Sequence, residues 1–262
     1  MFTRFLFLQL LMTVITILSI AMLFTPIAFS SQEIKCLCIA DTMFSGHSSE
    51  HNTNCGARAN LRVKGWQGIV VFKFDMTNLK GSKADSATLK VYCSSITGTV
   101  SSPHTLTDMK ISTIAHDWIE GDGDYAVTDK ASTYDYPGGE LGMKWADKDY
   151  DGNGRNGVQI TVEDVINGLG GSVLNSEIPE ATFAVNKWTE IPIEAKVIQP
   201  LIDEKQYGIV IWQPDIGKNI DIASKENAGG QNSAVLLVRA RGAYVSSLEK
   251  VVSTWAMIKY GR

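Results

Sequence analysis

The chain has 262 residues, of which 44% are hydrophobic and 20% charged, and this balance excludes a disordered tail, a collagen-like rod and a multi-pass membrane protein. Its 24 basic and 28 acidic residues give a net charge of −4. Because nucleic-acid binding needs a basic surface, we expect no nucleic-acid partner.

Residues 1–30 are predicted to be an export signal. Arg4 precedes a largely apolar run over residues 5–24, and Ala28-Phe29-Ser30 places small residues at the two positions that signal peptidase reads. We therefore expect cleavage before Ser31 and a protein that is secreted or held at the cell surface. The alternative is an uncleaved anchor, because an apolar run of this length can span a bilayer. Residues 5–24 would then be the only membrane contact.

Export bears on the four cysteines, because an oxidising compartment favours disulfides. The candidates are Cys36, Cys38, Cys55 and Cys93, and they allow three pairings. Two neighbours in a strand that are two residues apart face the same way, so Cys36 and Cys38 are expected to pair with Cys55 or Cys93 rather than with each other. The alternative is free, buried thiols.

From residue 31 onward the dominant hydrophobic period is two, which indicates half-buried antiparallel strands. In residues 70–75, for example, Val70, Phe72 and Phe74 alternate with the other three positions. In chain order we expect strands at 34–41, 61–64, 70–75, 87–93, 109–117, 187–193, 207–213, 219–224 and 233–241. Many short strands separated by Gly- and Pro-containing turns predict an all-β fold, an antiparallel β-sandwich of the jelly-roll kind.

Helical signals are few. Short helices are expected near 161–168 and over 194–203, the latter bent by Pro200, and an amphipathic C-terminal helix is expected within residues 243–262. Between 121 and 157 the strand pattern fails, and such a long connection is usually functional. We therefore divide the chain into a signal (1–30), a sandwich domain (31–242) with an insertion at 121–157, and an amphipathic tail (243–262).

Several short segments, in the same order, resemble the motifs of DNRLRE domains. The matching pieces are Ala40-Asp41-Thr42, Asn52-Thr53-Asn54-Cys55-Gly56, Leu61-Arg62-Val63, Phe72-Lys73-Phe74-Asp75-Met76, Ser86-Ala87-Thr88-Leu89-Lys90-Val91-Tyr92, Trp118-Ile119-Glu120-Gly121, Tyr207-Gly208-Ile209 and Ala223-Ser224-Lys225-Glu226. The resemblance covers residues 34–241. The chain departs from the family pattern at Cys55, where an aromatic residue is usual, and in the long insertion.

The resemblance implies a jelly-roll β-sandwich of the kind carried by secreted bacterial proteins, often beside polysaccharide-degrading enzymes. Part of the family is counted as carbohydrate-binding modules with affinity for alginate. We expect no attached catalytic domain here, which leaves polysaccharide binding or a structural role at the cell surface.

Four basic residues, Arg62, Lys64, Lys73 and Lys90, point away from the apolar side of their expected strands. If those strands are neighbours, the four cations share one sheet face, which would suit carboxylate-bearing sugars. The alternative is ordinary solvated charges on the wet face of a sheet.

The insertion contributes a second candidate surface, formed by Tyr134, Tyr136 and Trp145. Sugar rings stack on exposed aromatic rings, so such a cluster with interleaved polar residues is a candidate sugar platform. The alternative is that these rings form the core of the loop itself.

Calcium is the one cofactor that the sequence suggests. Asp147, Asp149 and Asp151 alternate ahead of Gly152 and Asn153, as at the start of a calcium loop, although Val158 stands where the closing Glu would be. A solvated acidic turn is the alternative. By analogy with the structural calcium of jelly-roll sugar binders, Asp41 and Glu226 form a second candidate pair.

The chain lacks the GxSxG, HExxH and P-loop motifs, and no GxGxxG in it opens a helix, so we expect no organic cofactor and no enzyme activity. The predicted function is non-catalytic binding of an extracellular polysaccharide, with an acidic, uronate-containing polymer as the favoured class. One alternative is a structural or adhesive cell-envelope protein without a soluble sugar ligand. Another is a polysaccharide lyase or hydrolase whose catalytic groups carry no sequence motif.

Overall fold

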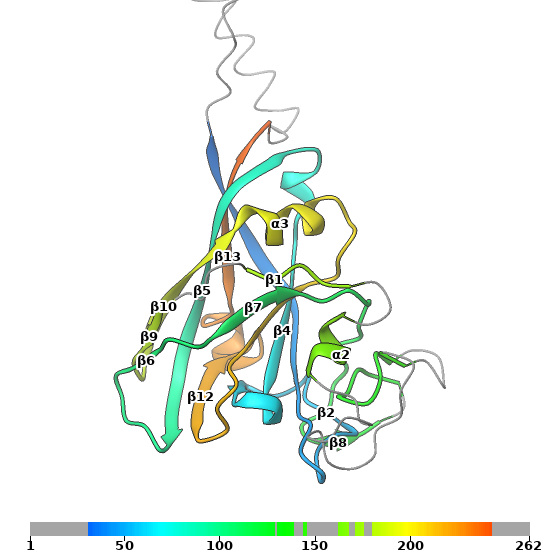
Figure 1. Cartoon of the computed structure of the whole chain (residues 1–262), viewed down its shortest axis with the longest axis vertical. Coiled ribbons are helices and arrows are strands. Elements are labelled where there is room, and N and C mark those ends of the chain that lie inside the picture. The colour runs from blue at the N-terminus through cyan, green and yellow to red at the C-terminus, as the bar shows by residue number, and fades with distance from the viewer. Residues whose placement is uncertain are drawn as a thin grey trace, which may run out of the picture. The chain divides into compact units, whose positions relative to one another are not determined.

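The computed structural model describes residues 31–128, 130–138, 144–145, 162–167, 171–175 and 180–242 (Figure 1). The longer strands are β1 (Gln32–Phe44), β4 (Ile69–Phe74), β5 (Lys83–Gly98), β10 (Lys187–Glu194), β12 (Lys218–Ala223) and β13 (Val235–Arg241). The shorter strands are β2 (Thr53–Asn54), β3 (Asn60–Val63), β6 (His104–Leu106), β7 (Lys110–Thr113), β8 (Ala126–Val127), β9 (Ala181–Phe183) and β11 (Ile209–Trp212). The described helices are α2 (Val162–Asn167) and α3 (Ala195–Ile202), with 3-10 turns η1 (Gly65–Gln67), η2 (Thr77–Leu79) and η3 (Asn227–Gly230).

Strand β1 belongs to two sheets. Its first part, residues 32–37, pairs with β13, and its second part, residues 38–44, pairs with β4 after a register shift next to Cys38. Sheet A has the order β3-β12-β5-β13-β1, with β10 also paired to β5, and sheet B has the order β1-β4-β11-β7. The pairings are antiparallel, so the predicted all-β antiparallel sandwich is confirmed.

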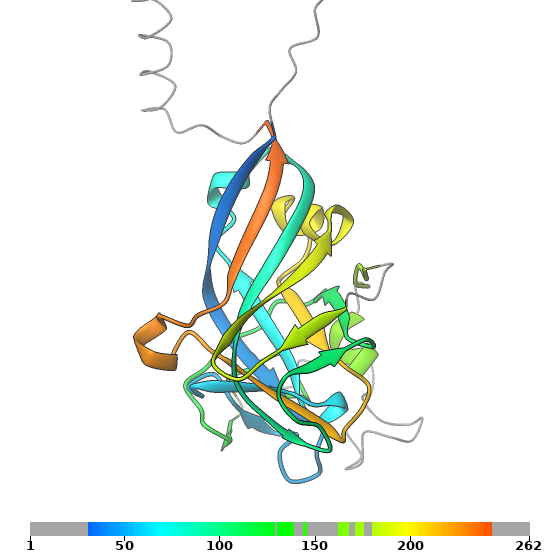
Figure 2. The same ribbon diagram turned by 90° about the vertical axis from the view of Figure 1, so that its left-hand side faces the viewer.

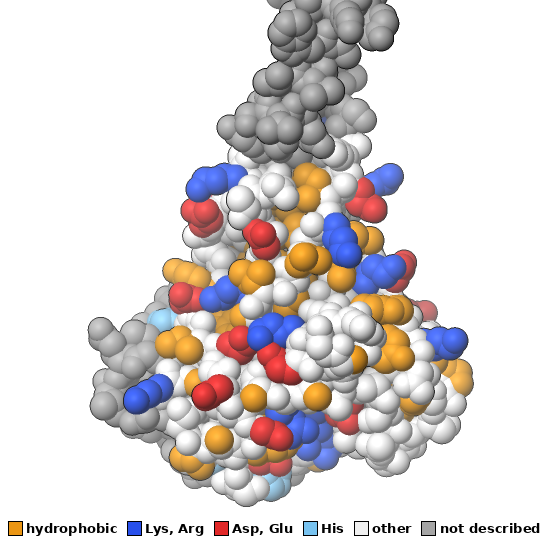
Figure 3. Space-filling view, turned by 180° about the vertical axis from the view of Figure 1, so that it is seen from behind, with side chains coloured by type: hydrophobic (Ala, Val, Ile, Leu, Met, Phe, Trp, Pro, Cys, Tyr) orange, Lys and Arg blue, Asp and Glu red, His pale blue; other side chains and the backbone are white. Residues whose placement is uncertain are grey.

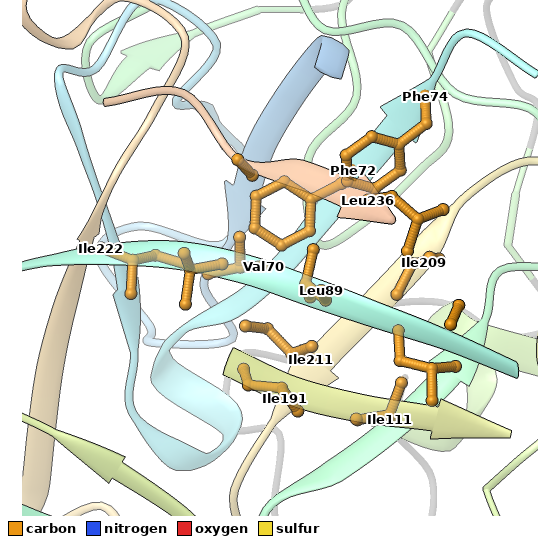
Figure 4. Close-up of a cluster of buried hydrophobic side chains, with 14 of the residues drawn as sticks. Val70, Phe72, Phe74, Leu89, Ile111, Ile191, Ile209, Ile211, Ile222 and Leu236 are labelled. Atoms are coloured by element: carbon orange, nitrogen blue, oxygen red, sulfur yellow. The ribbon is translucent and has the colours of Figure 1, made fainter. Parts of the chain in front are cut away.

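The main core lies between the two sheets (Figure 4). Every second residue of a strand faces this layer, so β4 contributes Val70, Phe72 and Phe74, and β5 contributes Leu89. Ile191, Ile209, Ile211, Ile222 and Leu236 reach the same layer from the other strands. Removal of these side chains from water is the main free-energy gain that holds the two sheets together.

The outer face of sheet B is buried as well. Ile69 and Val71 from β4 and Val210 from β11 pack against a second cluster that the insertion and α2 supply. The sequence pattern placed Val71 on the wet side of its strand, but Val71 is 0% exposed. Strands that are buried on both faces are apolar at consecutive positions, and this explains the run Ile69-Val70-Val71-Phe72.

The elements predicted from sequence agree well with the observed ones. The expected strand at 109–117 is shorter, since β7 ends at Thr113, where the backbone N–H groups of Ile114 and Ala115 turn to Gly208 and Ile166. Helix α3 contains Pro200, as expected, and α2 lies within 161–168. The predicted signal (1–30) and C-terminal helix (243–262) lie outside the described residues. Within the described part of the chain, no helix has the length and apolar character needed to cross a bilayer.

The prediction of disulfides is wrong for this structure, in which Cys36, Cys38, Cys55 and Cys93 are free thiols. The strand register shows why for Cys36 and Cys93. Cys36 lies opposite Leu236, Leu236 lies opposite Leu89, and Cys93 is four residues farther along β5. Two inter-strand steps and four residues exceed the ~7 Å between Cα atoms that a disulfide tolerates.

Candidate functional site

The four predicted cations do not share a sheet face, so that prediction is wrong. Arg62 lies on β3 at the edge of sheet A and Lys90 on β5 of the same sheet, but Lys73 lies on β4 in sheet B. Lys64 follows the end of β3, half-buried at the turn η1. The expectation required the strands of these cations to be neighbours in one sheet, but β3 lies in sheet A and β4 lies in sheet B.

Three of these cations are paired with acids. The Arg62 guanidinium is 2.7 Å from Glu50, the Lys90 ammonium is 2.8 Å from Glu190, and the Lys73 ammonium is 2.9 Å from Asp117. On the side of the molecule seen in Figure 3, basic and acidic side chains likewise lie next to each other rather than in separate patches. A surface of this kind does not attract anions by bulk charge, so any acidic ligand must be recognised locally.

The predicted aromatic platform is not formed by Tyr134 and Trp145. Both are 0% exposed, and the indole N–H of Trp145 donates a hydrogen bond to the Thr133 carbonyl oxygen at 2.9 Å. The Trp145 ring packs against Phe44, with 5.4 Å between the ring centroids. Tyr136 is half-buried, and its hydroxyl donates to the Thr128 carbonyl oxygen. Buried rings offer no face to a sugar, and these aromatics instead form the cover over sheet B.

The outer face of sheet A is open. Strands β10, β5, β13 and β1 run side by side there, and no described element lies in front of them (Figure 2). Cross-strand pairs place Glu190, Lys90, Val235 and Leu37 in one row, and Pro192, Thr88, Leu237 and Lys35 in the next. We call these two rows, together with Trp188 and Tyr92, the open face.

Two features distinguish the open face from an ordinary wet sheet. Trp188 is 42% exposed, and its ring meets Tyr92 edge-on at 5.5 Å between centroids. A hollow of about 300 Å³ is lined by Trp188, Lys35, Lys90, Val235 and Leu237. An exposed indole beside two ammonium groups is the combination that can stack on a sugar ring and bind a carboxylate at the same time.

A second hollow, also about 300 Å³, opens where β4 passes α3. Ile39, Phe74, Met76 and Leu201 form its apolar floor, and Tyr207, 40% exposed, stands at its rim. Lys73 reaches this hollow, but its ammonium is bound to Asp117 and lies 5.0 Å from the centroid of the Trp118 ring. The second hollow therefore has a single rim aromatic and a cation that is already engaged.

A third feature is a cluster of acids from three distant segments. One carboxylate oxygen each from Asp41 on β1, Glu120 after β7 and Glu226 after β12 lie within 4.8 Å of one another. The structure thus brings together Asp41 and Glu226, the second calcium pair that the sequence suggested, and adds Glu120. The calcium loop predicted at Asp147, Asp149, Asp151 and Asn153 lies outside the described residues.

Local structure explains how Glu120 reaches the cluster. Asn54 donates its side-chain N–H to the Glu120 carbonyl oxygen at 2.6 Å, and the backbone of Gly56 passes so close that a Cβ there would lie 2.1 Å from that oxygen. Gly121 follows with φ +73°, a conformation that a glycine adopts without strain. The Glu120 carboxylate then accepts a hydrogen bond from the Asp41 backbone N–H at 2.6 Å.

Burial and like charges shift the pKa values within the cluster. Burial raises the pKa of Asp41 to about 7, and the nearby Glu226 and Glu120 carboxylates add to this, while the hydrogen bond from the Lys225 backbone N–H opposes it. Burial also raises the pKa of Glu120. Hydrogen bonding to Glu226 raises the pKa of Lys225, so its ammonium stays charged.

Sequence reasoning missed Trp188, Tyr92, Lys35, Glu120 and Lys225. The first three carried a usable signal, because each occupies the outward phase of a strand whose inward phase is apolar, as in Thr189, Ile191 and Ile193. Glu120 and Lys225 carried no such signal, because each lies outside a strand and meets its partners only through the tertiary fold.

No protein-family model matches the chain, and comparison with curated proteins finds no significant match. The functional reading therefore depends on the geometry of the three sites described above.

Proposed function

We propose that this protein binds an extracellular polysaccharide without catalysis, through the open face of sheet A. The observation that carries the proposal is the exposed Trp188 beside Lys35 and Lys90 in one hollow on an uncovered sheet. A resemblance to DNRLRE domains, some of which bind alginate, supports the same reading. The favoured ligand is a uronate-containing polymer.

The chemistry of the hollow fits a carboxylated sugar. Trp188 presents an apolar ring against which the C–H face of a sugar can stack, and Val235 and Leu237 continue this apolar floor. Within the described residues Lys35 makes no ion pair, and Lys90 is held by the more exposed Glu190. A uronate carboxylate can therefore bind Lys35 directly and compete with Glu190 for Lys90.

The size of the face suits a chain polymer better than a single small molecule. From β10 to β1 the face spans three inter-strand steps of about 4.8 Å each, or about 14 Å. The residues that line the hollow lie on strands that no described element covers (Figure 2). A polymer can lie across such a face and extend beyond it at both ends.

The test is a binding screen of the full-length protein against neutral and uronate polymers, followed by titration of the best ligand with variants. We expect Trp188→Ala, Lys35→Gln and Lys90→Gln each to weaken binding at least tenfold, and binding to fall as salt rises. The matched controls come from outside the open face. Tyr207→Ala removes an aromatic of similar exposure, Lys80→Gln removes an exposed lysine, and both should bind normally.

Three results would contradict the proposal. If the folded protein binds no polymer of the panel, a structural or adhesive role in the cell envelope is favoured instead. Binding that Tyr207→Ala weakens and Trp188→Ala does not would place the ligand in the second hollow. Release of reducing or unsaturated ends from any polymer would instead show an enzyme.

A further inference from the structure

The acidic cluster has more negative charge than its neighbours satisfy. Lys225 is the one basic side chain that the described contacts place in it, with its ammonium 3.2 Å from Glu120 Oε2 and bonded to Glu226 Oε1. The ammonium thus contacts two of the three carboxylates, those of Glu120 and Glu226. Two backbone N–H groups, those of Asp41 and Lys225, supply the further hydrogen bonds, to Glu120 Oε1 and to Asp41 Oδ2.

Two oxygens of the cluster are buried without a hydrogen-bond partner in the described part of the chain. They are Asp41 Oδ1 and Glu226 Oε2. Asp41 is 0% exposed, so water does not compensate its charge from outside. A buried, unpartnered carboxylate oxygen costs free energy unless a cation or a donor meets it, and here two such oxygens belong to residues whose carboxylates converge.

We propose that Asp41, Glu120 and Glu226 bind a hard divalent cation, with Ca²⁺ the best match, in competition with the ammonium of Lys225. Carboxylates from three separate segments provide the all-oxygen set that calcium prefers, and calcium accepts their mixed, irregular geometry more readily than magnesium does. A cation there satisfies the two unpartnered oxygens that the ammonium does not reach.

A softer metal such as zinc fits the cluster less well. The one sulfur that contacts it is Cys38 Sγ, which donates a weak hydrogen bond to Asp41 Oδ2 at 3.6 Å. The three carboxylates supply oxygen ligands, whereas zinc sites in proteins are built mainly from sulfur and nitrogen. No histidine belongs to the cluster as the described residues form it.

The ion would join three parts of the sandwich. Asp41 lies on the part of β1 that pairs with β4, Glu120 directly precedes the insertion that covers sheet B, and Glu226 follows the end of β12 in sheet A. An ion that binds only the folded chain stabilises it in proportion to its affinity and concentration. The site is independent of the sugar proposal, and its test needs no glycan.

The experiment is a calcium titration of the full-length protein after treatment with a chelator, followed by calorimetry and by the thermal unfolding midpoint. We expect saturable binding near one ion per chain and a midpoint that rises with calcium and returns with chelator. Magnesium at the same concentration should give a smaller rise.

Three variants decide between a metal site and a purely structural ion-pair cluster. Asp41→Asn should lower calcium affinity at least tenfold. Lys225→Met removes the competing ammonium, so it should lower the midpoint of the metal-free protein and raise calcium affinity several-fold. Asp203→Asn, a surface acid outside the cluster, should behave as the parent protein.

The proposal is overturned if calcium produces no heat and no midpoint shift in either the parent protein or Lys225→Met. It is also overturned if Asp41→Asn folds and keeps the calcium response of the parent. The Lys225→Met arm keeps the test decisive if Asp41→Asn does not fold.

Discussion

The outer face of sheet B is covered, whereas the outer face of sheet A is open to solvent. On sheet B, the insertion and α2 cover Ile69, Val71 and Val210, and the aromatic residues of the insertion are buried. On sheet A, the outward side chains of strands β10, β5, β13 and β1 remain partly or fully exposed. The contrast shows that an aromatic residue in a long loop is not by itself a binding residue. It becomes core when the loop folds back on a sheet.

The same contrast separates two kinds of tryptophan. Trp145 lies in the insertion, where long connections usually carry function, yet it is fully buried. Trp188 lies in a regular strand, yet its ring is exposed and faces two lysines across the hollow. The face that is left uncovered, rather than the loop, is therefore the better candidate for ligand binding.

The largest effect is expected when a charge is placed on each outer face. Val71→Lys buries an ammonium under the cover of sheet B and should lower the free energy of unfolding by more than about 4 kcal/mol. Leu37→Lys adds the same group to the open side of sheet A, where Leu37 is 56% exposed, and should cost less than about 1 kcal/mol. Urea unfolding followed by fluorescence measures both. Similar losses in the two variants would show that the open side is covered in solution.

Truncation of the two tryptophans should give the next largest difference. Trp145→Ala leaves a cavity beneath the cover and removes the contact with Phe44, so a loss of about 3–5 kcal/mol is expected. Trp188→Ala, on the open face, should lower the free energy of unfolding by less than about 1.5 kcal/mol. Chemical unfolding of the two variants side by side is the measurement. A loss for Trp188→Ala as large as that for Trp145→Ala would mean that Trp188 is structural.

The reactivity of cysteine thiols can be used to compare the buried side and the exposed side of β1. Burial, with the charge of Asp75, raises the pKa of Cys36 to about 11, two units above its ordinary value of 9.0. At pH 8 its thiolate is therefore about 100-fold scarcer than that of an ordinary thiol, and burial hinders the reagent further. Cys55 and Cys93 are buried with pKa values also raised to about 11.

The expected result is that a thiol reagent modifies the native protein slowly. In contrast, Leu37→Cys, whose new thiol faces solvent one residue from Cys36, should react at least 100-fold faster than Cys36. When the parent protein is denatured without any reductant, all four cysteines should react with the reagent. Fewer than four equivalents would show that some cysteines are oxidised, against the free thiols of the structure.

The smallest expected effects come from two ion pairs of closely matched exposure, one on each sheet. The Lys90 and Lys73 side chains are 31% and 32% exposed, and their partners Glu190 and Asp117 are both 62% exposed. Double-mutant cycles should give coupling energies of about 0.2–1 kcal/mol for each pair. Lys73 also lies over the Trp118 ring, so Lys73→Ala should cost about 0.5–1 kcal/mol more than Lys90→Ala. Equal losses of stability in the two alanine variants would show that the contact between Lys73 and Trp118 does not stabilise the fold.

The strands were largely predictable because half-buried strands show their periodicity directly. Leu89 and Val91 against Lys90, or Leu61 and Val63 against Arg62, mark the inward side without any knowledge of the partner strand. The candidate site was predictable only in part. Lys90 was predicted from its outward position in its strand. Lys35 and Trp188 share its hollow, but they lie on β1 and β10, and sequence alone did not place these strands in one sheet with β5.

The sequence by itself determined the all-β class, most strand positions, the two short helices and the inward side of the strands near 61–64, 70–75 and 87–93, because these depend on residues close together in the chain. Only the tertiary structure decided that β3 and β4 lie in different sheets, that the insertion covers sheet B, and that Asp41, Glu120 and Glu226 converge. Alternation shows that a strand has two sides. What packs against each side depends on the order of strands in the sheets, which no local pattern encodes.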